Sequence, residues 1–515
     1  MKLVKLLILS LVVLLVACSK QDKLENHIPE NSIFLMKVNT PSMIKKVAWD
    51  ALFSDGFFDL FDENKKTGES MRKMSKSGLD MTHEFYLFKT KEHFNEEFSM
   101  IFELDNKQQL ITLLDSEGFK SKETAGIHRV LLENGVFLSF NDKVALLTIT
   151  ERMAFLDDLE SKVITTSYSD HGKLYKDVIK SDHDVVSSSD YSEVLKTQVA
   201  AMTFKKNSFD VSVFEGDYIF GFIDFLDGKI VSDYNYFAGE SSKSLIQSME
   251  KENKIPELTK AGAGESPIAS LGMSFNFESI VSFMRTNGIL ADIDKKAGIL
   301  RLYGTSAEEL LGFFKGDFLM CLESIQNKEV VKNSYRFNEA QGSMESYIDT
   351  VQKTTPVYIY SNTVNNEARL KQLMATFHTM LEDKGGYLSV KGGSDIYIRL
   401  EKEILSVTNS EDLMKDMIAG KELLIESDDK KGLSENAYFL DLRTNKCIPA
   451  LKQFIPGMDK ELNDVEDLID GIQAKGAPSK EGFHYNTEVI FRNEDDNSLF
   501  QMFEFAKSLK QQEAA

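Results

Sequence analysis

The chain has 515 residues, of which 42% are hydrophobic and 27% are charged, and it contains only 8 prolines and 30 glycines. These values are typical of a folded chain with room for two core-forming units, and they exclude a disordered or collagen-like protein. The formal net charge of −21 repels nucleic-acid phosphates, so we expect no nucleic-acid partner.

The first seventeen residues have the pattern of a signal peptide. Lys2 and Lys5 form a short basic start, and residues 6–16 are an apolar run interrupted only by Ser10. A helix needs about 20 apolar residues to cross the hydrocarbon core of a membrane, so this run is too short to span it. Export of the chain is therefore predicted.

The residues that follow resemble the bacterial lipobox. Residues 15–18 read Leu-Val-Ala-Cys, in which small residues precede a cysteine that receives a diacylglycerol group. We predict Cys18 as the lipid attachment site, carrying palmitate or similar chains, because two acyl chains hold a protein firmly on a membrane. By the same resemblance, Ser19 is compatible with transfer to the outer membrane. The expected location is the cell envelope, and the sequence favours neither a periplasmic nor a surface-facing domain. An ordinary secreted protein with an incidental Cys18 is the alternative.

Short apolar strands, each followed by a capping residue and an amphipathic helix, recur along the chain. In residues 32–47, Asn39 or Thr40 can cap a helix that has Pro41 in its first turn. Similar units are predicted at residues 99–114, 184–197, 268–284, 356–377 and 437–454.

Five pairs of segments indicate a tandem duplication. They are 25–30 with 252–257, 38–44 with 275–281, 81–88 with 315–322, 136–149 with 396–409, and 236–245 with 490–499. The predicted fold class is α+β, with two homologous halves that each have a mainly antiparallel sheet and helices on one face. The predicted organisation is a signal peptide at 1–17, a lipidated tether at 18–27, a first repeat at 28–258, a linker at 259–267, a second repeat at 268–510 and a tail at 511–515.

Two cysteines remain in the mature chain, both in its second half. Cys321 lies in the apolar run of residues 317–323, which predicts a buried strand, and Cys447 lies far from it in sequence. An exported protein permits a disulfide between them, but two free cysteines are favoured, and no catalytic cysteine is expected.

Catalytic and metal-binding motifs are weak throughout the sequence. Residues 261–266 resemble a phosphate loop but lack its lysine, and neither a Gly-x-Ser-x-Gly elbow nor a His-Glu-x-x-His motif occurs. His83 lacks a second histidine one turn away, so a surface role is favoured there. The triplet at 182–184 reads Asp-His-Asp, which is more typical of a solvated turn than of a metal site. Trp49 heads an aromatic stretch at 49–61 that is expected to pack in a core.

One segment matches a calcium-loop template in part. Asn493, Asp495, Asn497 and Glu504 occupy its positions 1, 3, 5 and 12, but Ser498 replaces the glycine that the sharp turn needs. Helix capping by Asp495 or by the following aspartate is the favoured interpretation.

Three phrases carry a family resemblance: residues 28–38, 311–319 and 496–499. With the lipobox and the duplicated halves, they make the chain resemble the uncharacterised Bacteroidota lipoproteins grouped as domain of unknown function 4836, over nearly the whole mature chain. Ser32 stands where that family commonly has alanine. The resemblance implies a lipoprotein signal and brings no established activity, cofactor or catalytic residue.

The leading hypothesis is a non-enzymatic, lipid-anchored envelope protein that presents a binding surface to an unidentified protein or ligand, without a cofactor or a metal. One alternative is an envelope hydrolase that uses paired carboxylates as acid and base. Another is a calcium-dependent surface adhesin that uses residues 493–504.

Overall fold

The computed structural model describes most of the chain after the predicted tether. The described residues are 23–47, 77–80, 82–91, 98–133, 135–150, 152–166, 173–201, 211–296, 304–338, 342–392, 395–452 and 457–513. They form two compact units, unit 1 (1–198, 218–223 and 506–515) and unit 2 (199–217 and 224–505). The predicted linker at 259–267 lies inside unit 2. Among the described residues, no helix is both long and apolar enough to cross a membrane.

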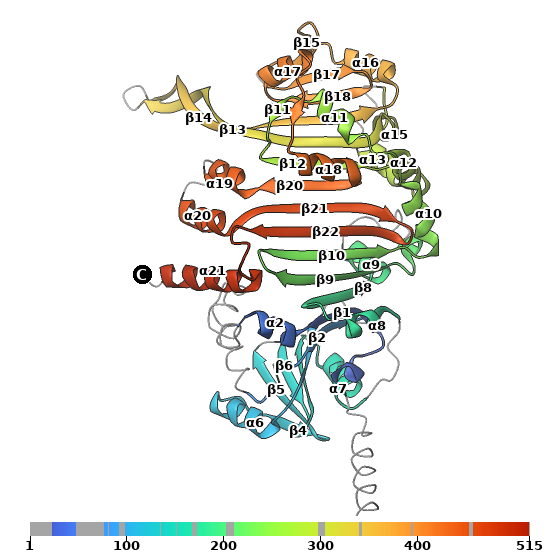
Figure 1. The fold of residues 1–515 in the computed structure, drawn as a ribbon, viewed down its shortest axis with the longest axis vertical. Helices are drawn as coiled ribbons and strands as arrows, with labels where there is room; N and C mark the ends of the chain where they lie inside the picture. Colours follow the sequence, from blue (N-terminus) through green and yellow to red (C-terminus); the bar gives the residue numbers. More distant parts are fainter. Residues whose placement is uncertain are drawn as a thin grey trace, which may run out of the picture. The chain divides into compact units, whose positions relative to one another are not determined.

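Unit 1 is a mixed α and β unit (Figure 1). Its elements are η1 (Leu24–His27), β1 (Ser32–Val38), α2 (Thr40–Lys46), β2 (Phe85–Thr90), β3 (Phe98–Glu103), α6 (Lys107–Ser116), β4 (Lys122–Thr124), β5 (Ile127–Glu133), β6 (Val136–Phe140), β7 (Val144–Ile149), α7 (Met153–Ile164), α8 (Lys173–Lys180) and β8 (Val185–Asp190). Three more elements, α9 (Tyr191–Ala201), β9 (Tyr218–Leu226) and α21 (Ser498–Glu513), have residues in both units. The strands pair antiparallel in the order β4-β5-β6-β7-β3-β2-β1-β8-β9.

Helices cover both faces of the sheet in unit 1, whereas the sequence predicted helices on one face. Ile101 and Phe102 are neighbours on β3, so their side chains point to opposite faces, and both are buried. Ile101 packs in a cluster with α7 and α8, and Phe102 packs in another cluster with Leu110 and Leu114 of α6. A strand that is apolar on both sides requires a cover on both sides.

Unit 2 is larger and has two strands of unusual length. Its elements are η3 (Val211–Phe214), β10 (Lys229–Phe237), α10 (Glu240–Ser248), α11 (Ile255–Ala261), β11 (Gly264–Glu265), β12 (Ala269–Ser274), α12 (Phe277–Thr286), α13 (Ile289–Lys296), α15 (Ala307–Gly312), β13 (Phe314–Asn338), β14 (Ser343–Val364), α16 (Glu367–Thr376), β15 (Leu381–Asp383), β16 (Leu388–Val390), β17 (Tyr397–Glu401), β18 (Ile404–Thr408), α17 (Glu411–Ile418), β19 (Leu423–Leu424), α18 (Ser427–Glu435), β20 (Tyr438–Arg443), α19 (Thr444–Lys452), α20 (Asp459–Leu468), β21 (Ile469–Ser479) and β22 (Gly482–Phe491).

The main sheet of unit 2 is also antiparallel. Its order is β15-β16-β17-β18-β14-β13-β12-β20-β21-β22-β10. The short β11 and β19 form a separate parallel pair. Helices α11, α17 and α18 contribute to a core cluster with Leu319, Cys321 and Ile359 of the two long strands. This core anchors the part of the β13–β14 hairpin that belongs to the main sheet.

Several local predictions are confirmed by the structure. Asn39 caps α2, because its side chain accepts a hydrogen bond from the backbone N–H of Ser42 at 3.1 Å, with proline in the first turn. The hairpin predicted at 136–149 is β6–β7, with its turn at Asn141. The hairpin predicted at 396–409 is β17–β18.

Candidate functional site

Two of the features singled out in the sequence lie outside the described residues. They are the lipid attachment residue Cys18, together with the signal peptide and the start of the tether, and the aromatic stretch that begins at Trp49.

The two other cysteines are free, as favoured from the sequence. Cys321 lies in β13 with its side chain fully buried, and this burial raises the pKa of its thiol to about 12. Burial also raises the pKa of Cys447 in α19. A thiol with a raised pKa is mostly protonated at neutral pH and is a poor nucleophile, so neither residue has the environment of a catalytic cysteine.

The Asp-His-Asp triplet at 182–184 does not converge on a ligand. The carboxylate of Asp184 is buried and accepts hydrogen bonds from Ser42 Oγ at 2.7 Å and Lys46 Nζ at 2.5 Å. The ring of His183 stacks on Phe222 with the centroids 3.5 Å apart. These contacts tie α2 and β9 to the start of β8, which is a structural role.

The partial calcium loop is held together by its own hydrogen bonds. The Asn493 side chain donates to Asp496 Oδ2 at 2.7 Å and accepts from the backbone N–H of Asp495 at 3.1 Å. Asn497 donates to the backbone oxygen of Phe225 at 2.9 Å and accepts from the N–H of residue 499 at 3.1 Å, just before α21 begins. The residue next to the helix is therefore Asn497, one position after the aspartates that the sequence suggested as caps.

The structure brings together three possible metal-ligating side chains that the sequence did not show to be close. Ligand atoms of Asp80, His83 and Glu103 lie within 4.8 Å of one another. A hydrogen bond from His83 to Asp80 raises the pKa of His83. For Asp80, burial opposes ionisation most strongly, but hydrogen bonds from Thr82 and His83 together lower its pKa. Such a set of donors is able to hold a divalent ion. Sequence reasoning missed Glu103 because it lies on β3, twenty positions from His83.

A buried carboxylate pair lies between α18 and β20. Asp429 and Asp441 are both buried, and the guanidinium of Arg443 bonds to each of them and to the exposed Glu426. Burial and the charge of Asp441 raise the pKa of Asp429. The N–H groups of Arg443 bind the carboxylate oxygens of Asp429 and Asp441, which a catalytic acid–base pair would turn toward a substrate. The arrangement is therefore that of an internal salt-bridge network.

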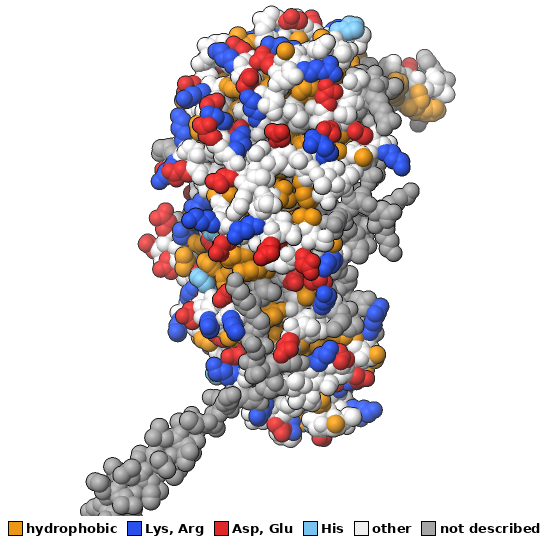
Figure 2. All heavy atoms as spheres, turned by 90° about the vertical axis from the view of Figure 1, so that its right-hand side faces the viewer, with side chains coloured by type: hydrophobic (Ala, Val, Ile, Leu, Met, Phe, Trp, Pro, Cys, Tyr) orange, Lys and Arg blue, Asp and Glu red, His pale blue; other side chains and the backbone are white. Residues whose placement is uncertain are grey.

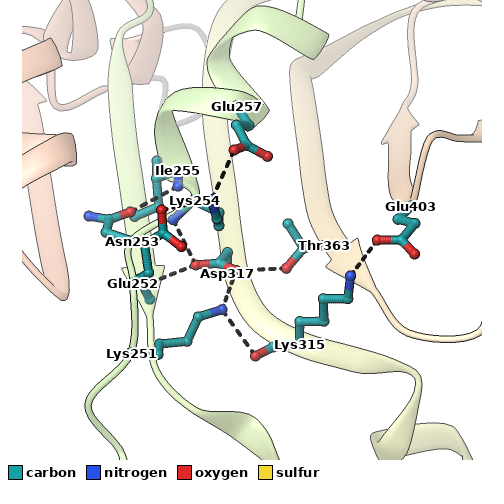
Figure 3. Close-up of polar contacts among 11 residues, drawn as sticks. Lys251, Glu252, Asn253, Lys254, Ile255, Glu257, Lys315, Asp317, Thr363 and Glu403 are labelled. Carbon is teal, nitrogen blue, oxygen red and sulfur yellow. Dashed lines mark hydrogen bonds and ion pairs between the residues drawn. The ribbon is translucent and has the colours of Figure 1, made fainter.

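The most unusual region of unit 2 is the β13–β14 hairpin, and its base is held by a buried carboxylate. Asp317 is fully buried and accepts hydrogen bonds from Ser274 Oγ of β12 at 2.6 Å and Thr363 Oγ1 of β14 at 2.8 Å. It also accepts from the backbone N–H of Lys254 at 3.1 Å and forms an ion pair with Lys251 (Figure 3). One carboxylate thus joins two neighbouring strands to the segment before α11.

The Asp317 group borders a cavity of about 390 Å³ in which basic and acidic side chains alternate. Lys251 pairs with Asp317, Lys315 pairs with Glu403, and Lys254 pairs with two glutamates of its own segment (Figure 3). The molecular face in Figure 2 likewise shows basic and acidic side chains interspersed. The cavity therefore has its charges neutralised internally, which suits a structural junction.

Beyond this base, the hairpin continues as an arm, defined here as residues 324–338 and 343–357. The ladder between β13 and β12 ends at Leu322, and the ladder between β14 and β18 ends at Ile359. A register shift between Leu322 and Ser324 marks the point where the strands leave the sheet. From there, within the described residues, the two strands pair only with each other, as the ribbon in Figure 1 shows.

One face of the arm is apolar and exposed. Val331, Tyr335 and Phe337 of β13 alternate along the strand, and Met344 and Ile348 of β14 stand on the same face by register. Their exposed fractions lie between 61% and 72%. Five large apolar side chains on one face of a two-stranded ribbon form the kind of patch that marks an interaction site.

The opposite face of the arm carries charged and apolar side chains together: Arg336 and Glu345 stand there with Tyr347 and Val351, whose exposed fractions are 40% and 37%. Arg336 is paired across the ladder with Glu345, with an ion-pair distance of 3.7 Å, and its guanidinium lies 5.6 Å from the ring centroid of Tyr347. Nearer the sheet, on the same face as Val331 and Ile348 by register, Gln352 donates to Glu329 at 3.0 Å. The more exposed apolar side chains of the arm's outer half thus lie on the face of Tyr335, Phe337 and Ile348.

Comparisons with known proteins add little. No family model and no curated protein matches the chain. Among solved structures, crystal form I of TP0453 is matched with a TM-score of 0.29 and 9% identity, over 43% of this chain and 81% of that chain. Crystal form III gives a TM-score of 0.30 and 11% identity, over 45% and 83%. Likeness at this level carries no argument about fold or function.

Proposed function

We propose that this chain is a lipid-anchored cell-envelope protein of the outer membrane that acts by binding a protein partner, without catalysis, and that the β13–β14 arm is its binding element. The observation that carries the proposal is the exposed apolar face of the arm. A two-stranded ribbon is only marginally stable in water, and leaving five large apolar side chains in solvent adds a further cost. A partner that covers this face removes the cost.

The proposal includes an origin by tandem duplication, which two observations support. The strand orders of units 1 and 2 follow the same scheme. In unit 1, β4 to β7 lie side by side and are followed by β3, β2 and β1. In unit 2, β15 to β18 lie side by side and are followed by β14, β13 and β12. In unit 2, β10 pairs with β22 over nine residue pairs without a register shift. These strands end at Phe237 and Phe491, which lie 254 positions apart, the offset of the last pair of similar segments.

The lipid anchor is tested by replacing Cys18 with alanine. We expect the variant to appear in the soluble fraction of lysed cells, because an exported chain that lacks the thiol of residue 18 cannot receive acyl chains there, whereas the parent stays with the membranes. Fractionation followed by immunodetection measures the change. Cys447→Ala serves as the matched control and is expected to stay with the membranes. Membrane retention of the Cys18 variant equal to that of the parent would contradict lipid anchoring.

Binding through the arm is tested by the accessibility of residue 348 in cells. In a Cys447→Ser background, Ile348→Cys places a thiol on the apolar face, and a small maleimide reports its exposure. We expect the labelling rate in intact cells to be at least about fivefold below that of the dilute purified protein, because a bound partner excludes the reagent from a desolvated patch.

Lys402→Cys is the control for this measurement. The Lys402 side chain is 86% exposed on the turn between β17 and β18, away from the arm face. It is expected to label at the same rate in both settings. Equal rates in both settings for the residue 348 thiol as well would show that the arm is uncovered in cells and would overturn the proposed function.

A further inference from the structure

Three side chains able to ligate a metal lie together in unit 1, at the end of β3. One ligand atom each of Asp80, His83 and Glu103 lies within 4.8 Å of the other two, so all three lie within about 2.8 Å of a common point. Bonds from zinc to nitrogen and oxygen ligands are about 2.0–2.2 Å long, so shifts of less than about 1 Å would place the three atoms around one ion. Among the described residues, no other set of three His, Cys, Asp or Glu residues meets this distance.

The backbone that carries the two carboxylates is fixed. Leu79 and Leu104 are antiparallel bridge partners, and both are buried in the cluster that contains α6. The backbone N–H of Asp80 donates to the backbone oxygen of Glu103 at 2.9 Å. Asp80 and Glu103 are therefore opposite each other across this short ladder, with their side chains on the same face.

The two oxygens of the Asp80 carboxylate have different surroundings. The Asp80 side chain is only 6% exposed, and its Oδ1 accepts hydrogen bonds from the N–H and the Oγ1 of Thr82 at 2.9 and 2.6 Å. Its Oδ2 bonds to Nδ1 of His83, whose side chain is 64% exposed. In the part of the chain that the structure describes, the Glu103 carboxylate takes part in no hydrogen bond or ion pair. One fixed oxygen thus lies beside two side chains that have room to turn toward an ion.

Charge and donor type select the kind of ion. Two carboxylates carry a charge of −2, which a divalent cation neutralises, and the exposed Asp105 adds to the negative potential around His83. An imidazole nitrogen suits zinc, copper, iron and nickel, whereas calcium and magnesium take oxygen ligands. Three protein ligands leave the fourth position of a tetrahedral zinc ion to water.

We propose that Asp80, His83 and Glu103 bind a zinc-class divalent cation, which links the segment before β2 to the end of β3. The ion stabilises the folded chain, because the three donors come together only when the chain is folded. This site goes beyond the proposed function and does not depend on it, since its residues belong to unit 1 and the arm belongs to unit 2.

Zinc titration of the purified, metal-stripped full chain tests the site. Cys447→Ser is used as the background, because Cys447 is a free, partly buried thiol and thiolates bind zinc. We expect one zinc ion per chain by isothermal titration calorimetry. The melting temperature is expected to rise by at least about 3 °C when free zinc exceeds the Kd a hundredfold. Calcium at the same concentration is expected to leave it unchanged, and an equal rise with calcium would overturn the choice of a zinc-class ion.

Two variants each remove one ligand. His83→Ala deletes a mostly exposed side chain, and Glu103→Gln keeps the size of the side chain, so both are expected to fold as the parent does. Circular dichroism and the melting temperature without metal check this. Each variant is expected to bind zinc at least tenfold more weakly than the parent, because a second-row ligand cannot replace the lost donor.

Asp105→Asn and His484→Ala are the matched controls. Asp105 is exposed and close to His83 but is not one of the three donors, so its loss measures electrostatic attraction alone and is expected to weaken binding less than about threefold. His484 pairs with Asp233 at 2.8 Å without a third ligand among the described residues, so His484→Ala is expected to leave the affinity unchanged. An affinity within twofold of the parent for His83→Ala or Glu103→Gln would overturn the three-ligand site, and so would an equal loss for Asp105→Asn.

Discussion

Replacing Asp317 by asparagine is expected to lower the free energy of unfolding by about 3–5 kcal/mol, the usual loss when one partner of a buried ion pair is removed. The substitution keeps the size of the side chain but leaves the ammonium of Lys251 without its counter-charge. It also replaces one acceptor oxygen by an NH₂ group, which turns donors toward Ser274 or Thr363. Chemical denaturation of both proteins measures the difference.

The pH dependence of this difference identifies its origin. Burial opposes ionisation of Asp317 most strongly, but hydrogen bonds from Lys251, Ser274, Thr363 and the backbone of Lys254 together lower its pKa below the ordinary value. A lowered pKa in the folded state gives stability that is present above the pKa of the unfolded chain and is lost as pH falls through the folded pKa. The gap between wild type and Asp317→Asn is therefore expected to be full at neutral pH and to shrink in acid.

An exposed ion pair provides the control. Asp416 and Lys421 are 2.8 Å apart and both are exposed, so Asp416→Asn is expected to change stability by less than about 1 kcal/mol. Adding Lys251→Met to Asp317→Asn is expected to recover part of the loss, because no unpaired charge is then buried. A loss of less than 1 kcal/mol for Asp317→Asn would contradict the role of this carboxylate at the base of the hairpin.

The sequence predicted correctly the features that are formed by residues close together along the chain. The cap at Asn39 lies three positions from the N–H that it binds, and the turn at Asn141 joins strands that follow each other directly. Alternation of apolar residues is enough to place such hairpins. Cys321 was placed in a buried strand for the same reason.

Features that depend on distant residues could not be read in this way. Asp317 was visible only as the edge of the run around Cys321, because its partners Ser274, Thr363 and Lys251 are 43, 46 and 66 positions away. The arm was missed for a different reason. Alternation along residues 331–337 is what a half-buried strand shows, and one sequence does not tell whether the apolar face has a cover.

Alanine at Gly482 is the second substitution with a large expected effect, about 3 kcal/mol of lost stability. Gly482 opens β22 opposite Phe237 at the end of β10, and a Cβ placed there would lie 1.9 Å from the backbone oxygen of Tyr236. Backbone cannot rotate away as a side chain does, so β10 and β22 must separate at this end of their ladder. Thermal and denaturant unfolding measure the loss.

Substitution of Gly228 by alanine tests the proposed duplication. Gly228 precedes β10 as Gly482 opens β22, it lies 254 positions earlier, and a Cβ there would lie 2.7 Å from Cα of Glu494 at a φ of +68°. Gly228 lies in the left-handed region and Gly482 does not, so Gly228→Ala is expected to cost at least as much as Gly482→Ala. Gly312→Ala is the control, because a Cβ at that helical position meets nothing within 4 Å, and it is expected to be neutral or slightly stabilising. A large loss of stability for Gly482→Ala with none for Gly228→Ala would argue against the equivalence of the turns before β10 and β22. The backbone that faces each glycine would then pack closely against only one of the two turns.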